Sequence, residues 1–272
     1  MNALPKLRIG LVGCGAIGRV VARGIEQEDF PAELVGVTDA VQELADKLSA
    51  ELPSSPPVMT LPDLVAASNL VMEAVTPQAA PAIVEAAIKG GRDIMMMSVG
   101  ALVMNPALMD LAREHGRVIH ASSGAIAGLD GVKSAAQGEL RSVTITTRKP
   151  PNGFRGVEEI ERQGIDLDRL DHPHVLFEGP AREAIKKFPA SVNVSSALSL
   201  AGLGPDRTTV RVVVDPGAQQ NVHEIQVEGD FGRLTTRTEN VPSPDNPKTS
   251  YLAALSALAT LRRIADPVRI GT

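Results

Sequence analysis

The first residues that could do chemistry form a glycine-rich turn near the start of the chain. The turn reads G-C-G-A-I-G over residues 13–18, and it follows an apolar run from Leu7 to Val12. Where such a turn joins a strand to a helix, its glycines permit a tight bend, close approach of a pyrophosphate and close packing. The free N–H groups of the helix then face the phosphates. We expect dinucleotide contacts from Gly13, Gly15, Ala16, Ile17 and Gly18.

An acidic residue lies at the place where a dinucleotide site binds the ribose. Asp39 closes a second apolar run that begins at Glu33, about 20 residues after the turn. A carboxylate at this place accepts a hydrogen bond from the ribose 2′-hydroxyl of NAD and repels the 2′-phosphate of NADP. Arg19 lies beside the turn and leaves NADP open as an alternative. The sequence therefore predicts NAD or NADP as the cofactor.

Two polar residues follow further predicted strands. Thr76 comes after the run from Leu70 to Val75, and Ser98 comes after the run from Asp93 to Met97. Ligands bind outside the carboxyl ends of parallel strands, so either residue could line a nicotinamide pocket. The alternative for each is helix capping, with Thr76 as the N-cap and Pro77 as the first helical residue.

His223 is the histidine whose surroundings in the sequence are most informative. In the predicted strand from Val222 to Val227, His223 shares one face with Ile225 and Val227, and the other face is charged. The imidazole should therefore point inward. A histidine can exchange protons near neutral pH, but a core histidine with satisfied hydrogen bonds would have the same pattern.

Other reactive residue types give weaker signals. Cys14 lies inside the glycine turn, and we interpret it as a small packing residue. The histidines and the cysteine lack the spacing of a metal site, and the pair His172 and His174 is typical of a surface turn. Arg148 and Lys149 end a predicted strand, where charged residues are usually solvated. We expect no metal.

These residues must be positioned by two kinds of structure. Over residues 1–120, strands alternate with helices, which predicts a parallel, doubly wound Rossmann sheet. After residue 120, strands follow one another closely, at residues 142–149, 208–214, 222–227 and 233–238, with a helix around residues 190–201. We expect an α/β chain with a dinucleotide-binding domain at 1–120, completed by a C-terminal helix within 248–272. A substrate and dimerisation domain on a mixed or antiparallel sheet should occupy 121–247.

Composition narrows the class of protein. The chain has 272 residues, 43% of them hydrophobic, and a formal net charge of -5. The negative charge argues against a nucleic-acid partner, which requires a basic surface. The apolar runs are too short for a membrane helix, and a single cysteine suits a reducing compartment. We expect a soluble, cytoplasmic enzyme.

The sequence also resembles a known family over nearly its whole length. The matching segments are G-C-G-A-I-G at 13–18, S-V-G-A-L at 98–102, S-S-G-A-I-A-G-L-D at 122–130, L-F-E-G at 176–179, F-P-A-S-V-N-V at 188–194, N-V-H-E-I at 221–225 and D-N-P-K-T-S at 245–250. They resemble the L-aspartate dehydrogenase family. Its members oxidise aspartate through iminoaspartate to oxaloacetate and ammonia with NAD or NADP, which can supply pyridine nucleotide biosynthesis.

The resemblance implies roles for particular residues. It places the catalytic histidine at His223 and cofactor contacts at Asn193 and at Ala127, with Ala125 as the alternative for the last. It also implies a homodimer. Ala40 stands where relatives commonly carry arginine. The substrate carboxylates need cationic or hydroxyl partners, and the candidates by position are Ser122, Ser123 and Lys248. Arg148 and Lys149 are weaker candidates for this role, because a charged strand end is usually solvated.

Two other functions compete with this hypothesis. One is a related Rossmann reductase of the homoserine dehydrogenase or dihydrodipicolinate reductase type. The other is a non-catalytic sensor of NAD(H). The N-V-H-E-I segment favours an enzyme, because a sensor would not require the histidine.

Overall fold

The chain folds into two compact units. The structure is a computed structural model that describes residues 6–189, 193–243 and 246–272. The first unit contains residues up to Ser122 together with Ala254–Ile270, and the second contains Ser123–Ala253 together with the last two residues. No helix among the described residues is long and apolar enough to cross a membrane.

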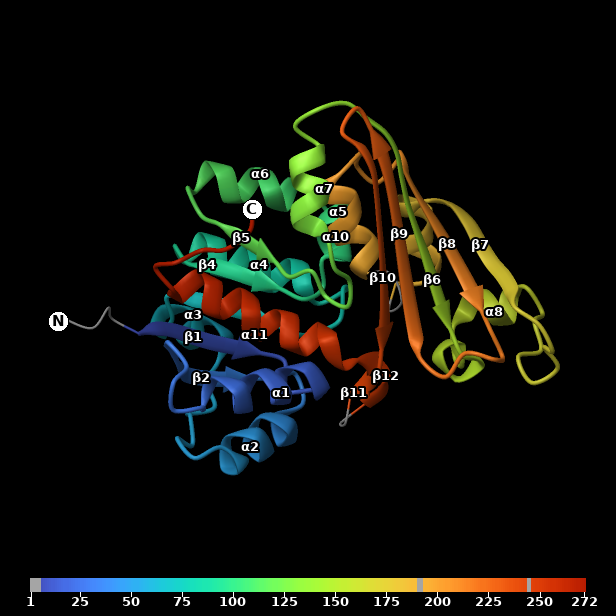
Figure 1. The fold of residues 1–272 in the computed structure, drawn as a ribbon. Coiled ribbons are helices and arrows are strands. Elements are labelled where there is room, and N and C mark those ends of the chain that lie inside the picture. The colour runs from blue at the N-terminus through green and yellow to red at the C-terminus, as the bar shows by residue number, and fades with distance from the viewer. Residues whose placement is uncertain (1–5, 190–192, 244–245) are drawn as a thin grey trace. The chain divides into compact units, whose positions relative to one another are not determined.

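A five-stranded parallel sheet forms the centre of the first unit (Figure 1). Its strands are β1 (Leu7–Val12), β2 (Ala32–Thr38), β3 (Leu70–Glu73), β4 (Asp93–Met96) and β5 (Ile119–Ala121), and their spatial order is β2-β1-β3-β4-β5. A single parallel bridge joins Val37 to Val58 beyond β2. If this bridge is counted as a strand, the order becomes 3-2-1-4-5-6, which is the Rossmann order. The predicted doubly wound sheet is confirmed.

The bridge beside β2 is very short. Val37 N donates to the Pro57 carbonyl at 3.0 Å, and Met59 N donates to the Val37 carbonyl at 3.0 Å. Pro56 precedes this segment and is buried. The segment that covers the outer side of β2 begins with two prolines. It bonds to β2 at a single residue, Val37.

Helices connect the strands of the first unit. They are α1 (Ala16–Ile25), α2 (Gln42–Glu51), α3 (Leu61–Ala67), α4 (Ala80–Lys89), α5 (Gly100–Met104) and α6 (Ala107–Glu114). The last helix of the chain, α11 (Tyr251–Ala265), contributes its residues from Ala254 onward to this unit. Leu258 packs against Gly24 so closely that a side chain at Gly24 would meet it at 2.5 Å.

The start of α4 differs from the prediction. The helix begins at Ala80, and Thr76 lies before a turn instead of serving as the N-cap. The Thr76 carbonyl accepts hydrogen bonds from the N–H groups of Ala79 and Ala80, at 3.0 and 3.1 Å. The chain therefore makes an extra turn before the helix, and the predicted capping role of Thr76 is wrong.

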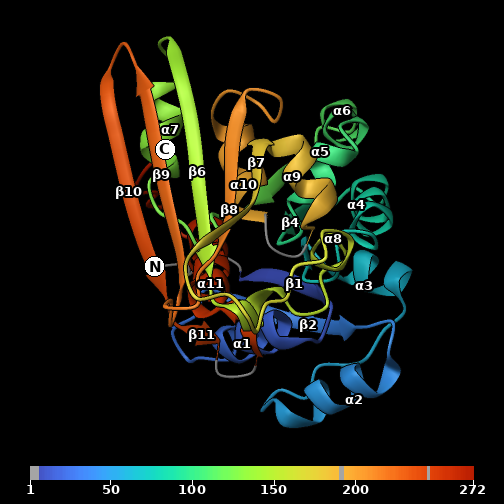
Figure 2. The ribbon, with the colours of Figure 1, turned by 90° about the vertical axis from the view of Figure 1, so that its right-hand side faces the viewer.

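A mixed five-stranded sheet forms the centre of the second unit (Figure 2). Its strands are β6 (Leu140–Lys149), β7 (His174–Pro180), β8 (Thr208–Val214), β9 (Asn221–Gly229) and β10 (Gly232–Asn240), in the order β10-β9-β6-β8-β7. β6 runs parallel to β8, and the other neighbours are antiparallel. The predicted mixed sheet is confirmed, although the sequence did not indicate β7.

The two faces of this sheet have different compositions. One face, here called the inner face, is covered by α7 (Leu129–Ala135), α9 (Ala181–Lys187) and α10 (Asn193–Ala201) (Figure 2). The outer face carries ion pairs, including Arg237 with Glu224 and Arg148 with Asp215. The inner face is apolar at one end, with Val143, Ile145, Ile225 and Val227 buried, and it becomes polar toward the carboxyl end of β6.

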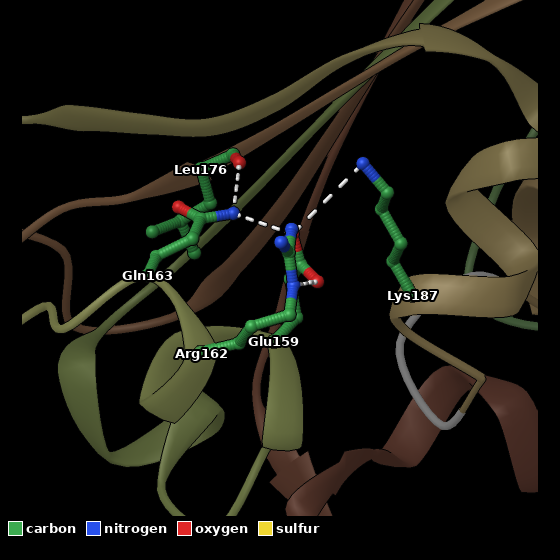
Figure 3. A network of polar contacts seen from close by, with 5 residues as sticks. All are labelled: Glu159, Arg162, Gln163, Leu176 and Lys187. Carbon is green, nitrogen blue, oxygen red and sulfur yellow. Dashed lines mark hydrogen bonds and ion pairs between the residues drawn. The ribbon is translucent and has the colours of Figure 1, made fainter.

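A polar network holds the segment between β6 and β7. The short 3-10 helix Pro151–Phe154 is followed by α8 (Glu158–Arg162), on which the buried Glu159 accepts hydrogen bonds from Arg162 and Gln163 (Figure 3). Gln163 also donates to the Leu176 carbonyl of β7 at 3.2 Å. The Arg162 hydrogen bonds are the main reason that the pKa of Glu159 falls to about 2. The network therefore connects α8 to β7 while its carboxylate stays charged.

Two short strands complete the chain. The two-stranded sheet β11 (Pro242–Ser243) and β12 (Asn246–Ser250) lies between β10 and α11 in the sequence. In the second unit, the ring of Phe188 lies beside those of Phe154 and Phe177, with centroid distances of 6.4 and 6.2 Å. His172 lies on the exposed turn before β7, whereas His174 begins the strand.

Candidate functional site

The glycine turn follows β1 and has room for a ligand at one position only. Gly13 has φ +101, and a Cβ there would meet the Ala74 carbonyl at 2.4 Å. A Cβ at Gly18 would meet the Gly13 carbonyl at 2.0 Å. By contrast, nothing lies within 4 Å of the place that a Cβ on Gly15 would take. The first and third glycines are therefore required by packing, and the second leaves open space.

The same turn begins α1 without a side-chain cap. Gly15 is the N-cap residue, and no side chain accepts a hydrogen bond from the first turn of the helix. An uncapped helix N-terminus attracts anions through its free N–H groups and its dipole. The open space at Gly15 and the uncapped helix together fit a pyrophosphate, which the turn was predicted to bind through Gly13 to Gly18.

Asp39 lies beside this turn, as expected. One carboxylate oxygen accepts a hydrogen bond from Cys14 N at 2.7 Å, and the other accepts from Val41 N at 2.9 Å. Asp39 therefore connects the end of β2 to the glycine turn. Burial, followed by the charge of Asp39, raises the pKa of the Cys14 thiol to about 12. Cys14 stays protonated at neutral pH and is unsuited to nucleophilic attack.

A buried carboxyl group that the sequence analysis missed organises two neighbouring loops. Glu73, at the end of β3, is fully buried and accepts hydrogen bonds from Val75 N at 2.8 Å and Ser98 N at 3.1 Å. The Ser98 hydroxyl completes the link by donating to the Val75 carbonyl at 2.7 Å. Ser98 is thus a buried bridge between loops, and Thr76, one residue further along, is exposed. Burial raises the pKa of Glu73 despite these hydrogen bonds.

His223 occupies the polar end of the inner face in the second unit. It is 4% exposed, and it pairs across the sheet with Thr147 on β6 and with Thr238 on β10. The Thr147 hydroxyl lies 3.0 Å from His223 Nδ1. Burial, and then the charge of Lys149, lower the pKa of His223 to about 3. The imidazole is therefore neutral at physiological pH, and one of its ring nitrogens has a lone pair that can accept a hydrogen bond.

Lys149 overturns one expectation from the sequence. It ends β6 on the same face as Thr147, and it is 6% exposed instead of solvated. Among the described residues, none forms a hydrogen bond or an ion pair with its ammonium group. Burial lowers the pKa of Lys149 to about 8. Arg148 points to the other face and pairs with Asp215 at 3.0 Å, as a charged strand end usually does.

The segment 125–127 lies along β10, next to His223. The Ala125 carbonyl accepts hydrogen bonds from the Thr238 hydroxyl and the Asn240 amide, both at 3.0 Å. The Ala127 carbonyl accepts from the Thr236 hydroxyl at 3.1 Å. Ala125 is buried and Ala127 is exposed. Because Thr238 pairs with His223, this segment and the histidine belong to one cluster.

Asn193 lies near this cluster, at the start of α10. It is the first residue of the helix and is partly buried. The next residue, Val194, lies against Gly124, where a Cβ would meet its side chain at 3.3 Å. The structure therefore brings Asn193 close to the segment that contains Ala125.

The three residues proposed for substrate contact have different surroundings. Ser122 is buried in the first unit, and its hydroxyl donates to the Met97 sulfur at 3.4 Å. Ser123 is partly buried at the start of the second unit. Lys248 lies on β12, but its side chain is outside the described residues. Two residues later, Ser250 accepts a hydrogen bond from Asn221 at 3.3 Å.

The described residues include no group of three or more His, Cys, Asp or Glu side chains that could hold a metal. The reactive groups instead form two clusters, one in each unit. A Rossmann sheet with an open glycine turn, together with a second sheet that carries a buried histidine, defines a two-domain NAD(P)-dependent oxidoreductase.

Comparisons with known proteins identify the family. Residues 130–264 match the model described as "Aspartate dehydrogenase, C-terminal", and residues 13–122 match "Homoserine dehydrogenase, NAD binding domain". The L-aspartate dehydrogenase of Methanosarcina barkeri is 48% identical over 270 residues, which cover 98% of this chain and 100% of the relative. That of Methanocella arvoryzae is 50% identical over 268 residues, 97% of this chain and 99% of the relative. The chain belongs to the L-aspartate dehydrogenase family.

A solved structure supports the fold. The crystal structure of aspartate dehydrogenase from Thermotoga maritima matches with a TM-score of 0.75 at 24% identity, covering 97% of this chain and 99% of that chain. A homoserine dehydrogenase from Thiobacillus denitrificans matches with a TM-score of 0.62 at 13% identity, covering 96% of this chain and 75% of that chain. The fold is shared with the competing reductase class, whereas the match over residues 130–264 favours the aspartate dehydrogenases.

Proposed function

We propose that this protein oxidises L-aspartate with NAD or NADP and water to give oxaloacetate, ammonium, the reduced cofactor and a proton, and that iminoaspartate is the intermediate. The observation that carries this proposal is the identity of 48% over nearly the whole length of an L-aspartate dehydrogenase. The reaction could supply pyridine nucleotide biosynthesis through iminoaspartate.

Residues of the first unit fit the cofactor. The open space at Gly15 and the uncapped N-terminus of α1 suit the pyrophosphate, with Gly13, Ala16, Ile17 and Gly18 forming the rest of the turn. Asp39 retains carboxylate lone pairs for a ribose hydroxyl beyond its two backbone hydrogen bonds. The loops that contain Thr76 and Ser98 follow β3 and β4, at the edge where parallel sheets bind ligands. When bound, the nicotinamide accepts a hydride from the substrate Cα.

Residues of the second unit fit the proton transfers. In our proposal, His223 accepts a proton from the water that attacks the imine carbon. This requires a free lone pair on Nε2, so Nδ1–H must donate to the Thr147 hydroxyl, which lies at hydrogen-bond distance. Thr147 thereby fixes the tautomer and the orientation of the ring. We assign Asn193 and Ala127, or Ala125, to the nicotinamide, and Ser122, Ser123 and Lys248 stay candidates for substrate contact.

The proposed function has a direct test with a panel of substrates. Purified protein should reduce NAD, and NADP less well, in the presence of L-aspartate, because the Asp39 carboxylate repels a 2′-phosphate. L-glutamate should react at least about 10-fold more slowly, since one methylene is worth roughly 1–3 kcal/mol. Absorbance at the reduced nicotinamide band measures both. Activity with homoserine and none with aspartate would assign the protein to the competing reductases.

We also propose that the protein is a homodimer, with the second unit as the dimerisation domain. The outer face of its sheet supports this, because Thr144 and Thr146 on the middle strand stay partly exposed there, while α7, α9 and α10 lie on the inner face. Sedimentation at micromolar concentration should give the mass of two chains. A mass of one chain, about 28.6 kDa, would contradict the proposal.

A further inference from the structure

Among the described strand residues, the polar end of the inner face contains one charge and no counterion. The residues on this face of β6, β8, β9 and β10 alternate with those of the charged outer face, and all except Lys149 and His223 are uncharged types. His223 is neutral because burial lowers its pKa to about 3. The buried ammonium of Lys149 is therefore uncompensated among the described residues of these strands.

The groups around Lys149 are arranged for a polar ligand. On one side, Lys149 pairs with Val214 of β8. On the other side, Arg148 pairs with Val222 of β9, so the next residue, Lys149, lies across from Asn221. On its other side, Gly153 covers the alkyl chain, since a Cβ there would meet the Lys149 Cβ at 3.2 Å. The alkyl chain is thus packed in place, while the ammonium keeps its donors free.

Burying an unpaired ammonium is unfavourable, and lysine side chains are almost never fully buried unless they are paired. Lys149 lies two residues from Thr147 on the same face, and Thr147 contacts His223. A spacing of two residues along a strand corresponds to about 7 Å. This separation suits a small substrate whose reacting carbon faces the histidine while a carboxylate reaches the ammonium.

We propose that Lys149 binds a carboxylate of the substrate and supplies the counter-charge that a dicarboxylate requires next to His223. This assignment rests on the proposed function, because it takes aspartate as the substrate. It favours a residue that the sequence pattern ranked below Ser122, Ser123 and Lys248.

Succinate is a suitable probe, because it has the two carboxylates and the carbon skeleton of aspartate but no amine to oxidise. Its affinity for the enzyme in the presence of NADH can be measured by calorimetry for the wild type and for Lys149→Met. We expect the substitution to weaken succinate binding by about 10- to 100-fold, as for loss of a hydrogen bond to a charged group. The affinity for NADH should stay unchanged.

Two matched variants separate the effect of the Lys149 charge on succinate binding from a general loss of structure. Arg148→Met removes the neighbouring charge from the outer face, and it should leave succinate affinity within about 2-fold of the wild type. Lys149→Arg keeps the charge and should retain most of the binding. Lys149→Met should unfold at a temperature equal to or above that of the wild type, because it replaces an unpaired buried charge by an apolar group.

The pH dependence gives an independent signature. The Lys149 pKa of about 8 predicts that wild-type succinate binding is about tenfold weaker at pH 9 than at pH 7, because the ammonium loses its proton. Lys149→Arg should remove this dependence. His223, the other titratable group on this face of the described strands, stays neutral over the whole range.

The outcomes distinguish this inference from the proposed function. Wild-type turnover of aspartate together with unchanged succinate affinity in Lys149→Met would overturn the assignment of Lys149 alone. Equal loss of succinate binding in Arg148→Met and Lys149→Met would also overturn it, since no specific contact would be involved. A wild type that oxidises no aspartate would overturn both proposals.

Discussion

His223→Ala is expected to lower kcat for aspartate oxidation by about 10²–10⁴, the usual contribution of a positioned acid–base group. The neutral imidazole, held by Thr147 at 3.0 Å, is the group we assign to activation of water. NAD affinity should change little, because the residues assigned to the pyrophosphate and ribose belong to the first unit. The thermal unfolding temperature should fall modestly, since the buried Thr147 hydroxyl loses a partner at about 1–3 kcal/mol.

Ile225→Ala is the matched control for this prediction. Ile225 lies two residues further along the same face of β9 and is fully buried, but it carries no group that exchanges protons. Its truncation should cost about 2–5 kcal/mol of stability while kcat per folded molecule is retained. The decisive measurement is kcat and thermal unfolding on the same preparations. Normal kcat in His223→Ala with a large loss of stability would make His223 a core residue.

Gly15→Ala is expected to weaken NAD binding on the order of 100-fold while the fold is preserved. The place of the new methyl group is open in the protein itself, and Gly15 has φ -72, which alanine adopts without strain. The unfolding free energy should therefore change by less than about 1 kcal/mol. The methyl group would instead occupy space assigned to the pyrophosphate. Calorimetric titration with NAD measures the loss of affinity.

Gly18→Ala provides the contrast. A Cβ at Gly18 would meet the Gly13 carbonyl at 2.0 Å, so the backbone of the turn must shift. This variant should lose NAD affinity and also about 1–3 kcal/mol of stability. If Gly15→Ala bound NAD normally, the pyrophosphate would not lie against this turn, and the cofactor assignment of residues 13–18 would fail.

The regular parts of the fold were predictable because their residue patterns are local. The strands β1 and β8 begin and end where their apolar runs do, and the inward direction of His223 follows from simple alternation along β9. β7 was missed because its apolar run is only three residues long and is followed by Glu178, Gly179 and Pro180. The start of α4 was predicted too early in the chain, because Thr76-Pro77 is also compatible with a turn. In the structure these residues form a turn before the helix.

The candidate site was only partly predictable, because burial depends on neighbours far away in the sequence. Glu73 ends a strand and has no motif around it, so nothing local indicates that Val75 and Ser98 bind its carboxylate. Arg148 and Lys149 are adjacent in the sequence, yet the first has an ion pair and the second is buried without one. Alternation along β6 places Lys149 on the face of Val143 and Ile145, but only the packing of the folded sheet shows that this strand end is buried.

The short bridge beside β2 has a consequence for association between molecules. A sheet edge with free N–H and C=O groups can pair with a strand from another chain, and this pairing leads to aggregation. Beyond β2, the covering segment begins with Pro56 and Pro57, which have no N–H to donate to an incoming strand. The Pro57 carbonyl is already used by Val37. At this point the edge of the Rossmann sheet is therefore a poor template for strand addition.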